Sequence, residues 1–241
     1  MSHGSLKSKV LFVLLFAAIA LAAQQINFSA LVGAQNQFFT VFQLFGPIAG
    51  AFLGPIVGVG AVLISELGNA VVFGKAWGVL DVLRLTPMLF AAYYFGTHGK
   101  KAFRNLSVAV PIIAMALFML HPVGRQAWFF SLYWTIPIIA KFFPNNLLMK
   151  SFGATFTAHA VGGAIWVWTV PMTAQQWVAL IPVVAYERTV FALGIAVSFV
   201  AMTTVLAKLD ALAGSKVSGA VTIEKKYDLA LALKSFLKAR A

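Results

Sequence analysis

The chain contains no cysteine, only six acidic residues and few charges of either sign. The absence of cysteine excludes disulfide bonds, thiolate metal sites and a cysteine nucleophile. Charged residues make up 10% of the 241 positions and hydrophobic residues 61%, whereas a soluble domain carries about 25% charged residues. Too little polar surface is left to cover a water-soluble globule of this size. These counts exclude cytosolic enzymes, secreted domains and disordered chains, and they indicate an integral membrane protein.

Short motifs for nucleotide and hydrolase chemistry are also missing. The sequence has no G-x-x-x-x-G-K-[ST], no G-x-G-x-x-G after a strand, no H-E-x-x-H and no G-x-S-x-G. The chain therefore has no ATPase of the P-loop type, and we expect neither enzymatic activity nor a cofactor or metal. The 18 basic residues are not grouped with aromatic residues on a polar face, so nucleic acid is not an expected partner.

Long apolar runs predict an all-α, polytopic transmembrane helix bundle of six to eight spans. The firm runs, bounded by charge, proline or glycine, are 10–27, 46–73, 80–96, 106–121, 150–171 and 177–207. The first is expected to be a retained span rather than a signal peptide, because no convincing cleavage site follows it. Two weaker candidates are 28–45, which contains a polar triplet, and 126–143, which contains Pro137.

Basic residues orient the predicted spans, because cytoplasmic loops are enriched in lysine and arginine. With eight spans and both termini cytoplasmic, 14 of the 18 basic residues lie inside, two lie outside, and Arg84 and Arg188 lie within spans. This favours a transmembrane helical domain over 1–207 and a basic amphipathic cytoplasmic tail over 208–241. The tail is expected to be a solvated helix, to lie on anionic lipid or to dock a cytoplasmic partner.

Polar residues of the predicted spans gather in their outer halves, which is the arrangement that an outward-open cavity requires. Ionisable groups inside a bilayer are costly and mark functional sites. The candidate substrate-binding residues are Gln35, Asn36, Gln37, Glu66, Asn69, Arg84, His159, Trp166 and Glu187. Arg84 would pair with an anionic substrate group, whereas Glu66 and Glu187 would accept hydrogen bonds. The triplet 35–37 is either a gate over the cavity or a plain outer loop.

Structural alternatives exist for several of these residues. Asp81 and Arg84 are three apart and would pair at a helix start. His159 would make an interhelical hydrogen bond instead of a ligand contact. Glu187 and Arg188 are adjacent and point about 100° apart on a helix, so each is expected to need a partner from another helix.

Small residues recur at spacings of four, which permits close helix contact. Gly46, Gly50, Gly54 and Gly58 form such a ladder, and the first span carries Ala18-x-x-x-Ala22. The segment FGPIAGAFLGPIVGVGAVLISELGNAVVFG (45–74), this alanine motif and the basic loop after LTPMLFAAYYFGTHGKK resemble substrate-binding (S) subunits of energy-coupling-factor vitamin transporters. The resemblance covers roughly the first 105 residues, and Glu66 stands where the family has aspartate after the glycine stretch.

The resemblance implies a small helical subunit of a prokaryotic plasma membrane that binds a vitamin or related molecule from the outer face. It also implies that Ala18 and Ala22 pack on a helical coupling subunit, whose shared ATPases drive release. The sequence itself leaves three alternatives open. These are a non-catalytic assembly subunit of a larger membrane complex, a membrane enzyme or electron carrier that uses His121 and His159, and a stand-alone channel or secondary transporter.

Overall fold

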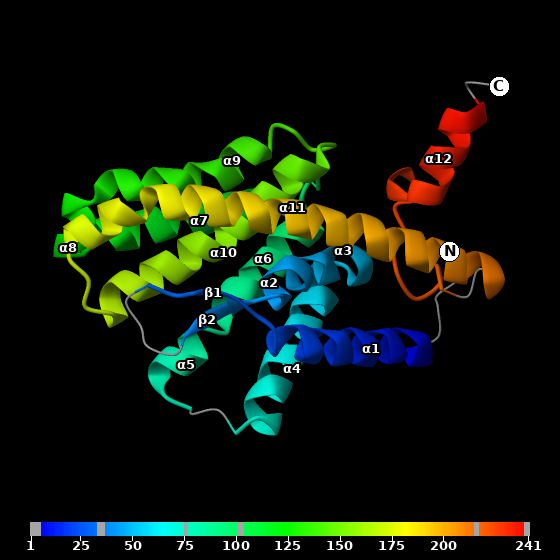
Figure 1. The fold of residues 1–241 in the computed structure, drawn as a ribbon, viewed down its shortest axis with the longest axis horizontal. Helices are drawn as coiled ribbons and strands as arrows, with labels where there is room; N and C mark the ends of the chain where they lie inside the picture. The colour runs from blue at the N-terminus through cyan, green and yellow to red at the C-terminus, as the bar shows by residue number, and fades with distance from the viewer. Residues whose placement is uncertain (1–5, 33–36, 75–76, 101–103, 215–216, 239–241) are drawn as a thin grey trace.

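A computed structural model describes residues 6–32, 37–74, 77–100, 104–214 and 217–238. They form an all-α fold with one short β-hairpin (Figure 1), which confirms the all-α part of the prediction. The elements in chain order are α1 (Leu6–Gln24), β1 (Asn27–Ala30), β2 (Phe38–Thr40), α2 (Phe42–Phe45), η1 (Gly46–Ile48), α3 (Ala49–Leu53), α4 (Pro55–Val72), α5 (Val79–Leu83), α6 (Thr86–Thr97), α7 (Arg104–Leu120), α8 (Pro122–Gln126), η3 (Trp128–Thr135), α9 (Ile136–Ala140), α10 (Leu147–Thr169), α11 (Ala174–Leu212), η4 (Lys225–Tyr227) and α12 (Leu229–Lys238).

Two helices within the described ranges, α4 and α11, are long and apolar enough to cross a membrane. The expectation of six to eight continuous spans is met only in part, because other apolar runs are divided into shorter helices. The 46–73 run breaks at Gly54, whose φ of 81° is a conformation that glycine adopts readily. Pro55 then begins α4 as a first-turn proline. The 80–96 run divides into α5 and α6, and 126–143 divides into η3 and α9.

The weak candidate span over 28–45 is wrong as a helix. Its first part forms an antiparallel hairpin in which β1 pairs with β2, with Asn27 opposite Thr40 and Ala30 opposite Phe38. Beyond these pairs, the amide of Leu31 donates to the carbonyl of Gln37 at 2.8 Å. The short helix α2 follows directly. The strands β1 and β2 have only four and three residues. Strands of this length are too short to give a strong sequence signal of alternating hydrophobicity.

The glycine ladder lies where α3, α4 and α6 meet, although Gly54 divides it between two helices. An added Cβ on Gly50 would lie 1.9 Å from the carbonyl oxygen of Ala92, and one on Gly58 would lie 2.5 Å from the Cα of Gly50. An added Cβ on Gly96 of α6 would lie 2.5 Å from the Gly50 oxygen. The three backbones therefore touch directly, as the small-residue spacing predicted.

The first turns of α1 lie at the same end of the molecule as the last turns of α11 and as α12 (Figure 1). The predicted tail boundary at 207 falls inside α11, which continues to Leu212. The chain then returns to the bundle. Val221 is buried in the core, and the amide of Thr222 donates to the Phe52 carbonyl at 2.8 Å. The first half of the tail is thus packed on the bundle, and α12 extends beyond it.

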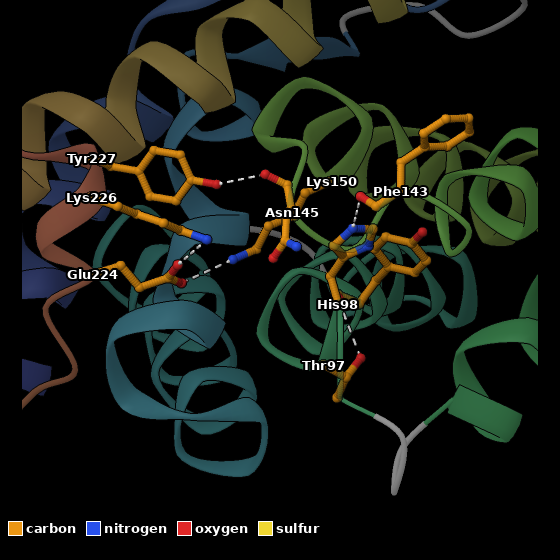
Figure 2. Close-up of polar contacts among 9 residues, drawn as sticks. Thr97, His98, Phe143, Asn145, Lys150, Glu224, Lys226 and Tyr227 are labelled. Atoms are coloured by element: carbon orange, nitrogen blue, oxygen red, sulfur yellow. Dashed lines mark hydrogen bonds and ion pairs between the residues drawn. The ribbon is translucent and has the colours of Figure 1, made fainter.

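Polar contacts hold the tail against the loops at this end (Figure 2). Glu224 lies between Lys150 and Lys226, with N–O distances of 3.4 and 3.7 Å, and the Tyr227 hydroxyl donates to the Asn145 carbonyl at 3.3 Å. Burial and the neighbouring Lys150 lower the pKa of Lys141 to about 8. Lys141 at the end of α9, Lys150 of α10 and Lys226 of η4 therefore converge at one end of the molecule.

Candidate functional site

A cavity of about 700 Å³ brings together the predicted substrate-binding residues. Its walls come from the hairpin, α4, α5, α10 and α11, which are far apart in the sequence. The predicted residues that line it are Gln37, Glu66, Asn69, Arg84, His159, Trp166 and Glu187. The other two, Gln35 and Asn36, lie outside the described residues. Cavities of 300–1,000 Å³ with mostly apolar walls and a few polar groups are typical of small-molecule sites.

Nearly all charged residues of the predicted spans line this cavity. Glu66, Asp81 and Glu187 are the three acidic residues that precede the tail, and all three line the cavity. Arg84 and Arg188, the two arginines within predicted spans, line it as well. The polar groups that are costliest to bury in a bilayer thus converge on one site.

Arg84 is already held by groups of the protein. It donates through Nη1 to Oε1 of Gln37, and its guanidinium carbon lies 5.9 Å from the ring centroid of Trp166. The expected Asp81–Arg84 ion pair is not found among the ion pairs of the described ranges. Asp81 accepts instead from the amide of Gly78 at 3.1 Å, because its side chain folds back onto the helix start. Arg84 is therefore free to reach across to the hairpin.

Asn69 belongs to an amide cluster between α1 and α4. Its Nδ2 donates to Oε1 of Gln24 at 2.6 Å, and its Oδ1 accepts from Nε2 of Gln25 at 2.9 Å. Nε2 of Gln24 donates in turn to the Ser65 carbonyl at 3.3 Å. Asn69 is 1% exposed. Because both Nδ2 and Oδ1 of its side-chain amide are hydrogen-bonded within the protein, Asn69 is better placed to fix the cavity wall than to bind a substrate directly.

Glu187 and Arg188 find partners on the hairpin, as their divergent directions on α11 require. Oε1 of Glu187 accepts from the Ser29 hydroxyl at 2.7 Å. The Arg188 guanidinium lies 4.5 Å from the Phe39 ring centroid and 4.6 Å from that of Phe191. The expectation that the two adjacent residues do not pair needs a correction, because Nη2 of Arg188 lies 3.7 Å from Oε2 of Glu187. The length of the arginine side chain makes this long contact possible.

His159 makes the interhelical hydrogen bond that was one of its two expected roles, and it also lines the cavity. The indole Nε1 of Trp134 donates to its Nδ1 at 3.0 Å. Trp166 is similarly anchored, since its Nε1 donates to the Val32 carbonyl of the hairpin at 3.3 Å. The hairpin thus contacts α5 through Gln37, α10 through Val32 and α11 through Ser29.

The second histidine considered for redox or enzymatic chemistry lies elsewhere. His121 precedes α8, where its Nδ1 accepts from the Val123 amide, and its ring stacks edge-on with Trp168 at 4.9 Å. It is not among the residues that line the cavity with His159. Within the part of the chain that the structure describes, no group of three or more His, Asp or Glu side chains is placed to hold a metal ion.

Several lining residues were not selected from the sequence. Phe38 and Phe39 come from β2, Trp177 from the first turn of α11, and Phe130 from η3. The sequence signal for the residues of β2 is the pair of short apolar runs on either side of the polar triplet, because two such runs fit a hairpin as well as a helix.

The two alanines of the first span lie on the exposed face of α1, whereas Ala17, Ala20 and Ala23 are buried. Ala18 and Ala22 are therefore sterically accessible to another helix. Neighbouring large apolar side chains, such as Leu15 at 56% exposure and Ile19 at 48%, extend this face.

No family model, curated protein or solved structure matches the chain.

Proposed function

We propose that this protein is the integral membrane, substrate-binding component of a small-molecule uptake transporter and that it has no ATPase of its own. The observation that carries the proposal is the convergence of five ionisable side chains, Glu66, Asp81, Arg84, Glu187 and Arg188, on one cavity. Buried charges without a function are selected against in a membrane because each costs several kcal/mol or more.

A membrane location is supported by the outer face of α11. Tyr186 is 71% exposed, Leu193 50%, Val197 68% and Val205 53%, which is a larger apolar stripe than water tolerates. In the proposed topology, α4 and α11 are two of the six to eight spans, and short helices stacked end to end, such as α5 with α6, complete the others. The basic end that carries the tail faces the cytoplasm, and the cavity opens toward the outer face.

Uptake through such a subunit needs an energy source from outside this chain. In keeping with the resemblance to energy-coupling-factor S subunits, we propose that a helical coupling subunit packs on Ala18 and Ala22 and connects the protein to ATPases. The vitamin-like substrate would enter from the outer face, with the β1–β2 hairpin as the gate. Aromatic side chains would supply most of the binding energy, and the few polar groups would fix orientation.

Ligand binding by the protein purified in mild detergent tests this proposal. We expect a small molecule to co-purify, to be identified by mass spectrometry after denaturation, and to change tryptophan fluorescence when it is added back, because Trp77, Trp166 and Trp177 line the cavity. A protein that releases no small molecule, and whose fluorescence responds to no vitamin or small organic acid or base, would contradict the proposal.

The second candidate function is a non-catalytic assembly subunit of a larger membrane complex. The exposed apolar face of α1 and the exposed Leu229, Leu231 and Leu233 of α12 favour it. This candidate predicts that partner proteins remain bound in mild detergent while the cavity stays without a ligand.

A further inference from the structure

Two buried N–H donors of the cavity have no acceptor in the described part of the protein. Arg188 and Trp177 are each 2% exposed, and both line the cavity. Neither Nε of Arg188 nor Nε1 of Trp177 has a hydrogen-bond partner there. Because a buried donor without a partner is destabilising, nearly all such groups are satisfied in native proteins.

The guanidinium of Arg188 is packed against aromatic rings, and its Nε has no acceptor among the described residues. Phe39 and Phe191 lie 4.5 and 4.6 Å from the guanidinium carbon, and their ring planes are at 75° to each other. The nearest carboxylate, Oε2 of Glu187, is 3.7 Å from Nη2, which is too long for a good hydrogen bond. Two aromatic rings therefore pack against a cation whose Nε has no acceptor among the described residues.

His159 adds a third donor to the same wall. An indole N–H can only donate, so the contact from Trp134 at 3.0 Å makes Nδ1 of His159 the acceptor. The proton of the neutral imidazole is then on Nε2, which becomes a donor. Because α10 ends at Thr169 and α11 begins antiparallel to it at Ala174, His159 lies level with the part of α11 between Trp177 and Arg188.

The spacing along α11 separates these donors into two groups. Arg188 lies roughly one helical turn, about 6 Å, from the level of His159, and Trp177 lies about 10 Å to the other side. One carboxylate can accept from both Arg188 and His159. The indole of Trp177 would need a second acceptor on the same molecule, such as a carbonyl or a ring nitrogen.

We infer that the substrate is a monocarboxylic acid with a flat apolar body and a second, neutral hydrogen-bond acceptor. Its carboxylate binds Arg188 and His159, and its second acceptor binds Trp177. This inference rests on the proposed function and replaces Arg84, which Gln37 and Trp166 already hold, as the anchor of the anionic group.

The charges of the lining exclude substrates with two or more negative charges. The described lining carries three carboxylates, Glu66, Asp81 and Glu187, against two guanidiniums. A phosphate dianion or a dicarboxylate would place its additional charge opposite these carboxylates. The rings of Phe130, Trp166 and Phe39 supply the walls for a flat apolar body.

Matched ligands test the inference. Indole, pyridine and benzene compounds would each be titrated as the acetic acid, the acetamide and the ethylamine, with tryptophan fluorescence and native mass spectrometry as readouts. We expect the acids to bind at least about tenfold more tightly than the amides and amines. The carboxylate accepts through two oxygens and pairs with the guanidinium charge, whereas the amide has one acceptor oxygen and the protonated amine has none. The molecule that co-purifies with the protein should contain one carboxylate.

Variants of the donor residues distinguish a loss of ligand binding from a loss of folding. R188Q should weaken the binding of the acids far more than that of the amides and so remove the preference for acids, and R188K should restore part of that preference. W177F should weaken ligands that carry the second acceptor, whereas W128F, at an exposed residue that does not line the cavity, should bind as the wild type does. If R188Q fails to fold, W177F and the ligand series still test the inference.

A preference for amines or neutral compounds, or a co-purified ligand without a carboxylate, would overturn the inference and leave the proposed function in place. If no compound of any series binds and nothing co-purifies, both the inference and the proposed function fail.

Discussion

Replacing Gly50 by alanine is expected to lower the free energy of unfolding by at least about 3 kcal/mol, at the upper end of overpacking effects. The added methyl would lie 1.9 Å from the Ala92 oxygen and 2.9 Å from the Gly96 amide. These are backbone atoms, so no side-chain rotation relieves the clash, and α3 must move away from α6. Since 1 kcal/mol corresponds to roughly 2–4 °C for chains of this length, the midpoint in detergent should fall by about 6–12 °C.

G60A is the matched control for this substitution. Gly60 lies in the middle of α4, where an added Cβ would meet no atom within 4 Å. Because alanine favours a helix over glycine by about 1 kcal/mol, G60A should be as stable as the wild type or more so. Thermal unfolding followed by size-exclusion chromatography measures both variants. Equal midpoints for G50A and the wild type would show that α3 and α6 are not in backbone contact.

Filling the cavity from Gly162 is expected to abolish ligand binding and preserve the fold. Gly162 of α10 lines the cavity, and an added Cβ would make an ordinary contact of 3.7 Å with Pro87, which also lines it. A leucine at 162 would occupy the space of the substrate between α10 and α6. We expect G162L to lose at least about a hundredfold in affinity, or about 2.7 kcal/mol, for the co-purified ligand.

The same substitution on α4 controls for the general effect of a leucine. G60L places an equal side chain in open space, so it should bind the ligand as the wild type does. Isothermal titration calorimetry gives both affinities, and the thermal midpoints show whether the fold is kept. A well-folded G162L with unchanged affinity would place the substrate outside this cavity.

The cavity lining was predictable from the sequence because so few ionisable residues are available. Before its tail, the chain has only three acidic residues, Glu66, Asp81 and Glu187. Unless these residues lie near Arg84 and Arg188, the free-energy cost of removing their charges from water is not offset. The same reasoning located His159. The all-α fold followed from the length of the apolar runs, and the close approach of Gly50 and Gly58 followed from their spacing.

Details that depend on tertiary contacts were not predictable. The packing of Arg188 against the rings of Phe39 and Phe191 joins residues that are about 150 positions apart in the sequence. The hairpin over 27–40 has an apolar content that suits a helix equally well, so local pattern could not decide between them. The break at Gly54 is visible as a glycine before a proline, but the same pair is tolerated within membrane helices.

The absence of cysteine allows the central claim, a binding cavity open to the outer face, to be tested with a single substitution. In G162C, the introduced thiol is the only one in the protein. We predict that a small membrane-impermeant thiol reagent added outside intact cells modifies G162C, and that the purified ligand slows this reaction. G60C, which faces open space on α4, should not be protected by the ligand. A G162C thiol that reacts only from the cytoplasmic side of inverted vesicles, or at the same rate with and without ligand, would contradict the account.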